Sequence, residues 1–135
     1  MSFSRTFPNE PASAAAVRRF VREIVERAPC RVEVDRAVLL ASELVANAAL
    51  HANSEEVRVH VAVAADGVRI AVTDEDPQPF SPRRAAPDDT SGRGMQLVDR
   101  LSDGWGMDYF QRSQKSVWFH LRSPAGGVSD PAGPD

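Results

Sequence analysis

The clearest pattern of apolar and polar positions is a strict alternation that begins at residue 57. Apolar side chains at every second position predict one buried strand face, formed by Val57, Val59, Val61 and Val63. Asp66-Gly67 predicts a hairpin turn, and the returning strand buries Val68, Ile70 and Val72. One further step of the alternation turns Asp74 toward the same side. A carboxylate in such a register needs a partner, because burying it alone costs several kcal/mol.

Two segments repeat their apolar residues with helical spacing instead. The first runs from Pro11 to about Ala28, with Asn9 as its expected N-cap and Pro29 ending it. The second runs from Val34 to His51. Its expected core stripe consists of Val34, Ala37, Ala41, Leu44, Val45 and Ala48.

The remaining elements are shorter. A polar stretch between Phe3 and Phe7 predicts an edge strand, and the end of the domain predicts strands at 105–110 and 116–121. Residues 77–91 are rich in proline and lack periodicity, which is typical of a lid, a binding loop or disorder. Residues 90–94 lead into a helix that carries Met95, Val98 and Leu101. We expect one domain over residues 1–122, followed by a disordered tail over residues 123–135 that is rich in glycine and proline.

We expect an α+β fold, a two-layer α/β sandwich in which about three helices cover one face of a mostly antiparallel, mixed sheet. The chain has 135 residues, enough for a real core, and a net charge of −3 that argues against direct nucleic-acid binding. Apolar runs are too short to span a membrane, which takes roughly 20 residues. The single cysteine, Cys30, excludes an internal disulfide. We therefore expect a cytoplasmic domain.

The second helix carries polar residues at a spacing suited to chemistry. Glu43, Asn47 and His51 follow one another at intervals of four, so they share one side of the helix beside its apolar stripe. A carboxylate and a carboxamide held in line can serve as a general base beside a metal ligand. A helix edge with ordinary solvated polar groups shows the same spacing.

A second candidate feature is Gly92-Arg93-Gly94 at the opening of the helix that follows the proline-rich stretch. Unpaired N–H groups and the helix dipole favour an anion such as phosphate there. Neither a Walker loop nor a complete Gly-x-Gly-x-x-Gly fingerprint is present, so a dehydrogenase is a poor interpretation. Glycine pairs before helices are also ordinary turns.

In chain order, Glu43-Leu-Val-Ala-Asn47, Asp74 and Gly92-Arg93-Gly94 resemble the motifs of the GHKL superfamily of ATP-binding domains, which have the Bergerat-type fold. The similarity covers residues 3–121, and within the superfamily the bacterial stand-alone anti-sigma-factor serine/threonine kinases are most similar. The resemblance implies ATP and Mg²⁺ as ligands. It makes Glu43 the general base or the residue that orients the nucleophile, and it makes Asn47 the Mg²⁺ ligand. Asp74 would accept a hydrogen bond from the exocyclic amine of adenine.

The same resemblance implies roles for four further residues. Gly92 and Gly94 would close the lid onto the phosphates, and Arg93 would reach a phosphate or remain solvated. Ser116 matches loosely a hydroxyl residue that helps to hold adenine, although a plain strand serine fits as well. The segment Asp74-Glu75-Asp76-Pro77 departs from the family's Asp-x-Gly-x-Gly by lacking both glycines. The role of Arg83 and Arg84 in the proline-rich stretch stays open.

Three functions follow from the resemblance. The first is a kinase that uses Mg-ATP to phosphorylate an anti-sigma antagonist protein of the STAS type and that sequesters a sigma factor. The second is a non-catalytic module in which nucleotide sets the affinity for a protein partner. The third is a domain of the same fold that works without nucleotide. Similar proteins form homodimers.

Overall fold

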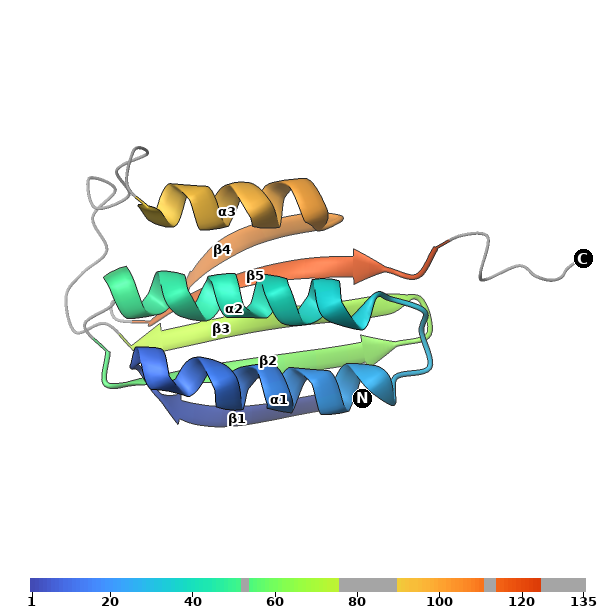
Figure 1. The fold of residues 1–135 in the computed structure, drawn as a ribbon, viewed down its shortest axis with the longest axis horizontal. Coiled ribbons are helices and arrows are strands. Elements are labelled where there is room, and N and C mark those ends of the chain that lie inside the picture. The colour runs from blue at the N-terminus through green and yellow to red at the C-terminus, as the bar shows by residue number, and fades with distance from the viewer. Residues whose placement is uncertain (52–53, 76–89, 111–113, 125–135) are drawn as a thin grey trace, which may run out of the picture.

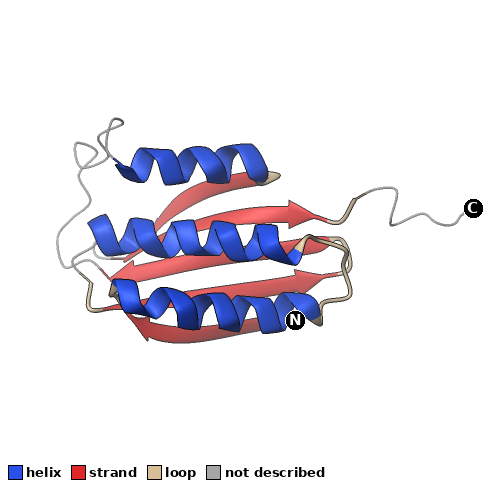
Figure 2. Cartoon of the chain, viewed as in Figure 1, coloured by secondary structure: helices blue, strands red, loops and turns tan. Residues whose placement is uncertain are grey.

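The alternating valines lie on two paired strands of an antiparallel sheet, and the strands of this sheet are red in Figure 2. The computed structural model describes residues 1–51, 54–75, 90–110 and 114–124. Within these residues the sheet has five strands in the order β1-β2-β3-β5-β4. The strands are β1 (Ser2–Pro8), β2 (Glu56–Ala64), β3 (Gly67–Glu75), β4 (Gly104–Phe110) and β5 (Gln114–Arg122). Each neighbouring pair is antiparallel, so the expected mixed sheet is antiparallel throughout the described part.

The predicted hairpin is the β2–β3 pair, in which Val59 lies opposite Val72 and Val57 opposite Asp74. Gly67 opens β3 with a positive φ of 159°. A Cβ at this position would overlap the carbonyl oxygen of Leu121 on β5. Gly67 is therefore required by the close approach of a neighbouring strand as well as by the turn.

The helices lie side by side on one face of the sheet (Figure 1). They are α1 (Ala14–Glu26), preceded by the short 3₁₀ helix η1 (Pro11–Ser13), then α2 (Val34–His51) and α3 (Thr90–Leu101). The range of α2 is the one predicted from the sequence. Since α2 lies between α1 and α3, it buries more than one stripe, including Val38 and Leu40 in addition to most of the predicted residues. The predicted two-layer sandwich is thus confirmed.

Asn9 does not cap the first helix, contrary to the prediction. Glu10 is the N-cap residue of η1. The Asn9 side-chain amide instead donates to the carbonyl oxygens of Ser54, at 2.9 Å, and Ala48, at 3.4 Å. Asn9 therefore ties the end of β1 to the segment that connects α2 to β2.

The boundary of the predicted tail falls in a segment that still contacts the domain. The Ser123 backbone N–H donates to the Asp66 carbonyl oxygen at 2.8 Å, and its hydroxyl accepts from the Arg31 N–H at 2.6 Å. The rest of the predicted tail, residues 125–135, lies outside the described residues. In the described part of the chain we find no helix long and apolar enough to cross a membrane.

Candidate functional site

The inner face of the sheet, which the helices cover, changes from apolar to polar at the end of β3. Direct cross-strand partners form rows on this face. The row through the middle of the sheet contains Val59, Val72, Val117 and Met107. The next row toward the end of β3 contains Val57, Asp74, Lys115 and Tyr109. Three polar side chains on adjacent strands thus lie beside the apolar Val72, Val117 and Met107 on this face.

Asp74 is the buried member of this row, with only 2% of its surface exposed. Its inward register, predicted from the alternation, is confirmed by the pairing with Val57. The Lys115 ammonium lies 3.8 Å from Oδ2 of Asp74, and the Lys115 side chain is 17% exposed. Because a buried carboxylate needs a compensating group, Lys115 explains in part how Asp74 is accommodated.

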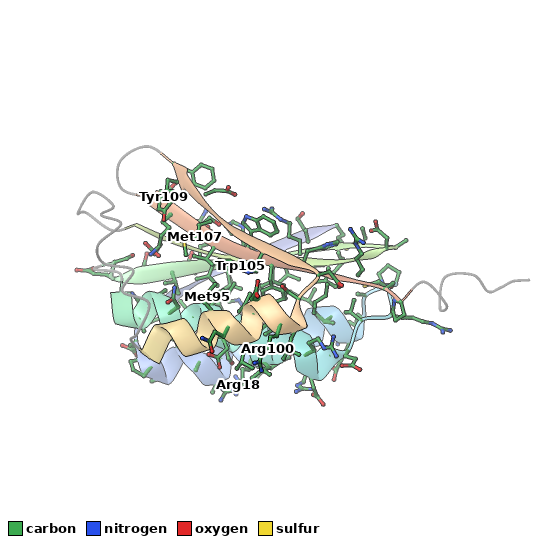
Figure 3. The ribbon with its side chains drawn as sticks, turned by 90° about the horizontal axis from the view of Figure 1, so that it is seen from above. Arg18, Met95, Arg100, Trp105, Met107 and Tyr109 are labelled. Carbon is green, nitrogen blue, oxygen red and sulfur yellow. The ribbon has the colours of Figure 1, made fainter. Side chains whose placement is uncertain are left out.

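Tyr109 continues the row onto the edge strand β4, next to Lys115. Partial burial, and then the negative charge of Asp74, raise the pKa of the Tyr109 hydroxyl above its ordinary value. Tyr109 and Met107 are nevertheless 44% and 38% exposed, although they share the inner face. Figure 3 shows both toward the end of α3 that carries Met95 and away from the end that carries Arg100. At this end of the sheet, part of the inner face is open.

The predicted residues of α2 lie over the same end of the molecule. The C-terminal half of α2, the end of β3 and the start of α3 lie at this same end (Figure 1). Glu43 and Asn47 are half-buried, beside the buried Leu44 and Ala48. Since α2 is continuous, the two side chains stand one turn apart on the same side of the helix. The side chain of His51 lies outside the described part.

The glycine motif lies inside α3, because this helix begins at Thr90. The sequence had placed Thr90 and Ser91 in the preceding loop. The first N–H groups of a helix have no intrahelical acceptor, so the Gly92 N–H lies in the first turn, where helix geometry favours an anion. The Gly94 N–H comes one turn later and is directed at the Thr90 carbonyl oxygen by helix geometry. The Arg93 side chain, and all of Arg83 and Arg84, lie outside the described residues.

A hydrogen bond attaches α3 to the edge strand. The indole N–H of Trp105 on β4 donates to Oδ1 of Asp99 on α3 at 2.9 Å. Val98 of α3 is fully buried in the core. The C-terminal half of α3 is therefore fixed to the sheet, and it holds the first turn of the helix over the open end.

Ser116 does not join this site. Its direct partner is Thr73, whose hydroxyl donates to the Ser116 Oγ at 3.1 Å on the outer face of the sheet. The expected contact between Ser116 and adenine has no support from this register, because neighbouring residues of a strand point to opposite faces. Lys115 is the inward residue, and sequence reasoning missed it. The sequence could have indicated this orientation, because Lys115 is separated by an even number of positions from Val117, Phe119 and Leu121, which are buried on the inner face.

The outer face of the sheet has a hollow of about 900 Å³. Of the predicted site residues only Ser116 lines it, together with side chains such as Arg58, His60 and Arg69. Glu43, Asn47 and Asp74 belong to the opposite layer. The hollow is therefore separate from the candidate site.

The donor set fits Mg²⁺ better than a tightly chelated metal. Among the described residues, no group of three or more His, Cys, Asp or Glu side chains could hold a metal ion. Mg²⁺ takes one or two protein oxygens and completes its shell with phosphate oxygens and water. The Asn47 carboxamide oxygen, beside Glu43 on α2, suits such a partial shell.

Taken together, the fold and the site define an α+β sandwich domain with a buried carboxylate, a carboxamide and a helix N-terminus at one end of its sheet. The sequence pattern of the histidine kinase-like ATPase domain matches residues 7–119. The chain belongs to this family, and the resemblance to GHKL domains is confirmed. Membership of a family of ATPase domains implies ATP binding and a general relation to ATP-dependent kinases.

Solved structures share the fold, and two of them serve as examples. Full-length ShkA in complex with AMPPNP matches with a TM-score of 0.57 and 18% identity, over 89% of this chain and 32% of that one. The histidine kinase domain of the Erythrobacter litoralis EL346 blue-light activated histidine kinase matches with a TM-score of 0.50 and 21% identity. That match covers 85% of this chain and 61% of the other. No curated protein matches the chain.

Proposed function

We propose that this domain binds Mg-ATP where α2, β3, β5 and α3 meet, and that it is a serine/threonine kinase of the anti-sigma-factor type. The observation that carries the proposal is Asp74, a carboxylate that is 2% exposed and faces inward at the open end of the sheet. Adenine offers an exocyclic amine to such an acceptor. A purine bound there directs its phosphates toward α2 and the start of α3.

Each proposed residue has a separate task. Asp74 accepts a hydrogen bond from the adenine amine, and Asn47 holds Mg²⁺ through its carboxamide oxygen. Mg²⁺, when bound, supplies charge neutralisation on the phosphates. The Gly92 N–H and the dipole of α3 favour the phosphate anion, while Gly94 leaves the helix surface clear of a side chain. Arg93 is a further candidate for phosphate contact.

Glu43 is the proposed general base of the transfer. It takes the proton of a serine or threonine hydroxyl as the oxygen of that hydroxyl bonds to the γ-phosphorus of ATP. The bond between the γ-phosphorus and the β–γ bridging oxygen breaks, and ADP leaves. Phosphoryl transfer depends mostly on positioning and electrostatics, and a carboxylate one helical turn from the metal ligand suits both.

The partners are proposed from the resemblance to stand-alone anti-sigma kinases. They are a STAS-type antagonist that receives the phosphoryl group and a sigma factor that is released or held according to the state of the antagonist. A homodimer and a cytoplasmic location belong to the same proposal.

The experiment compares Glu43→Gln and Asn47→Ala with the wild type by calorimetric titration of ATP, with and without Mg²⁺. ADP formation is then followed with STAS-type proteins of the same organism as acceptors. Glu43→Gln is expected to bind Mg-ATP normally and to lose transfer by 100-fold or more, which is about the contribution of a positioned base. Asn47→Ala is expected to lose the Mg²⁺-dependent part of binding.

Glu23→Gln, an exposed substitution on α1, is the matched control and should change neither readout. Unaltered phosphoryl transfer by Glu43→Gln would refute the role of Glu43 as the general base. Absence of any ATP binding to the wild type would overturn the whole proposal.

A second candidate is a non-catalytic module in which bound nucleotide sets the affinity for a protein partner. The segment Asp74-Glu75-Asp76-Pro77 favours this candidate, because the sequence lacks the two glycines that follow the adenine-binding aspartate in the family's Asp-x-Gly-x-Gly motif. This candidate predicts Mg-ATP binding that depends on Asn47, with no phosphotransfer in the wild type. The same titration and transfer assays therefore separate it from the kinase. A domain that works without nucleotide would show neither binding nor transfer.

A further inference from the structure

Lys115 places a cation on the inner face of the sheet, next to the buried Asp74. It is the only lysine of the sequence, and every other member of the 16 lysine and arginine residues is an arginine. It lies on β5 between Asp74 of β3 and Tyr109 of β4, on the inner face of the sheet. An ammonium group stands where the same face of β5 otherwise carries Val117 and Phe119.

The distance between Lys115 and Asp74 leaves the ammonium able to donate to a third group. Its Nζ is 3.8 Å from the nearer carboxylate oxygen, whereas a direct charge-assisted hydrogen bond is about 2.7–2.9 Å long. A lysine ammonium has three protons to donate, and a carboxylate accepts at several positions. Donor and acceptor therefore stand side by side at one end of the inner face.

The surroundings suit a flat, partly apolar ligand at this pair. Met107 and Tyr109 present exposed surface on the same inner face, beside Lys115 and along β4. Figure 3 places both toward the Met95 end of α3. Aromatic side chains stack on nucleobases, and a thioether packs against them. Asp74 and Lys115 can then form hydrogen bonds with polar groups on the edge of the ring.

Adenine carries a matching pair of groups on one edge, since the exocyclic amine at C6 donates and the neighbouring ring nitrogen N1 accepts. We propose that Lys115 is a specificity-determining residue that donates a hydrogen bond to N1 while Asp74 accepts from the amine. The inference rests on the proposed ATP site and adds a second contact to it. Two adjacent strands thus contact two neighbouring groups of adenine, the amine at C6 and the ring nitrogen N1.

The test uses 1-deaza-ATP, in which N1 is replaced by C–H, and compares its affinity with that of ATP by calorimetry. The wild type should bind 1-deaza-ATP roughly tenfold or more weakly, as expected for loss of a hydrogen bond to a charged group. Lys115→Met should bind ATP more weakly and show almost no difference between the two nucleotides. Arg122→Met is the matched control, because Arg122 is an exposed cation at the end of the same strand.

A second readout needs no substitution. Protein made with carbon-13-labelled lysine gives a single ε-methylene NMR signal, since the sequence has one lysine. ATP is expected to shift this signal strongly and 1-deaza-ATP only weakly.

The outcomes separate the inference from the function on which it rests. If ATP binds and Lys115→Met keeps the full penalty against 1-deaza-ATP, the contact with N1 is refuted while the ATP site stands. If both nucleotides bind the wild type equally, the inference fails in the same way. If ATP does not bind at all, both proposals fall together.

Discussion

Removing either partner of the Asp74–Lys115 pair should destabilise the domain, but by different amounts. At 3.8 Å and an effective dielectric constant of about 20, the two charges attract each other by about 4 kcal/mol before desolvation is subtracted. Lys115→Met leaves a carboxylate that is 2% exposed without its ammonium. Asp74→Asn leaves an ammonium on a side chain that is 17% exposed and can reach water along its flexible stem.

We expect Lys115→Met to lower the free energy of unfolding by about 3 kcal/mol, the lower end for breaking a buried pair, and Asp74→Asn by about 1 kcal/mol. For a domain of this length these losses correspond to decreases in Tm of about 10 °C and about 3 °C. The double variant should resemble Asp74→Asn, because the carboxylate that Lys115 compensated is absent. Its loss should therefore be smaller than that of Lys115→Met alone.

The assay is urea and thermal unfolding without nucleotide, followed by circular dichroism, with Arg122→Met as the exposed-charge control. That control should stay within about 0.5 kcal/mol of the wild type. An Asp74→Asn variant as unstable as Lys115→Met, or a double variant with additive losses, would refute the reasoning. In either case the burial of the carboxylate would not be what makes the pair asymmetric.

Two more predictions concern the outer face of the sheet. In Gly106→Ala the new Cβ would stand 2.8 Å from the Trp118 ring. The Arg69 guanidinium covers this ring at 4.5 Å from its centroid, so the ring cannot move away freely. The free energy of unfolding should therefore fall by about 1–3 kcal/mol. Gly104→Ala, where no atom lies within 4 Å of the new Cβ, is the control in the same denaturation assay, and an equal loss in both variants would contradict the steric argument. Burial, and then the nearby charge of Arg58, lower the pKa of His60 from its ordinary value of 6.5. The unfolded chain therefore takes up the proton more readily than the folded chain. The contribution of His60 to the free energy of unfolding should be fully present above pH 6.5 and should decline as the pH falls through that value. His60→Gln should flatten this decline between about pH 7.5 and pH 5, and an unchanged slope in unfolding measurements would assign the decline to other groups.

The parts of the fold that follow one local period could be predicted from the sequence. The period of two gave β2, β3 and the inward register of Asp74, and the helical period gave the full range of α2. Local patterns could not predict contacts between residues that are far apart in the sequence. The role of Asn9 depends on two carbonyl groups from residues 48 and 54, which no spacing near residue 9 reveals.

The site was predicted less completely, for a physical reason that Lys115 and Ser116 illustrate. A hydroxyl residue on a strand looked suitable for a contact with adenine, but strand parity decides which of two neighbours faces the helix layer. Parity was readable from Val117 and Phe119, whereas the pairing of Lys115 with Asp74 was not, because it joins residues about 40 positions apart. The start of α3 was also uncertain locally, since glycine weakens a helical pattern without preventing the helix.

The strand order has a consequence for how the protein is made. β5 follows β4 in the chain but pairs with both β4 and the much earlier β3. While a ribosome is still adding β5, the β1–β2–β3 sheet and its two helices can form, but β4 has no strand to pair with. Contacts between distant segments form late, and unpaired strand edges invite aggregation. The row that contains Asp74 and Lys115 is therefore completed only after β5 has emerged, and a chain arrested before residue 114 would expose the β3 edge to other strands.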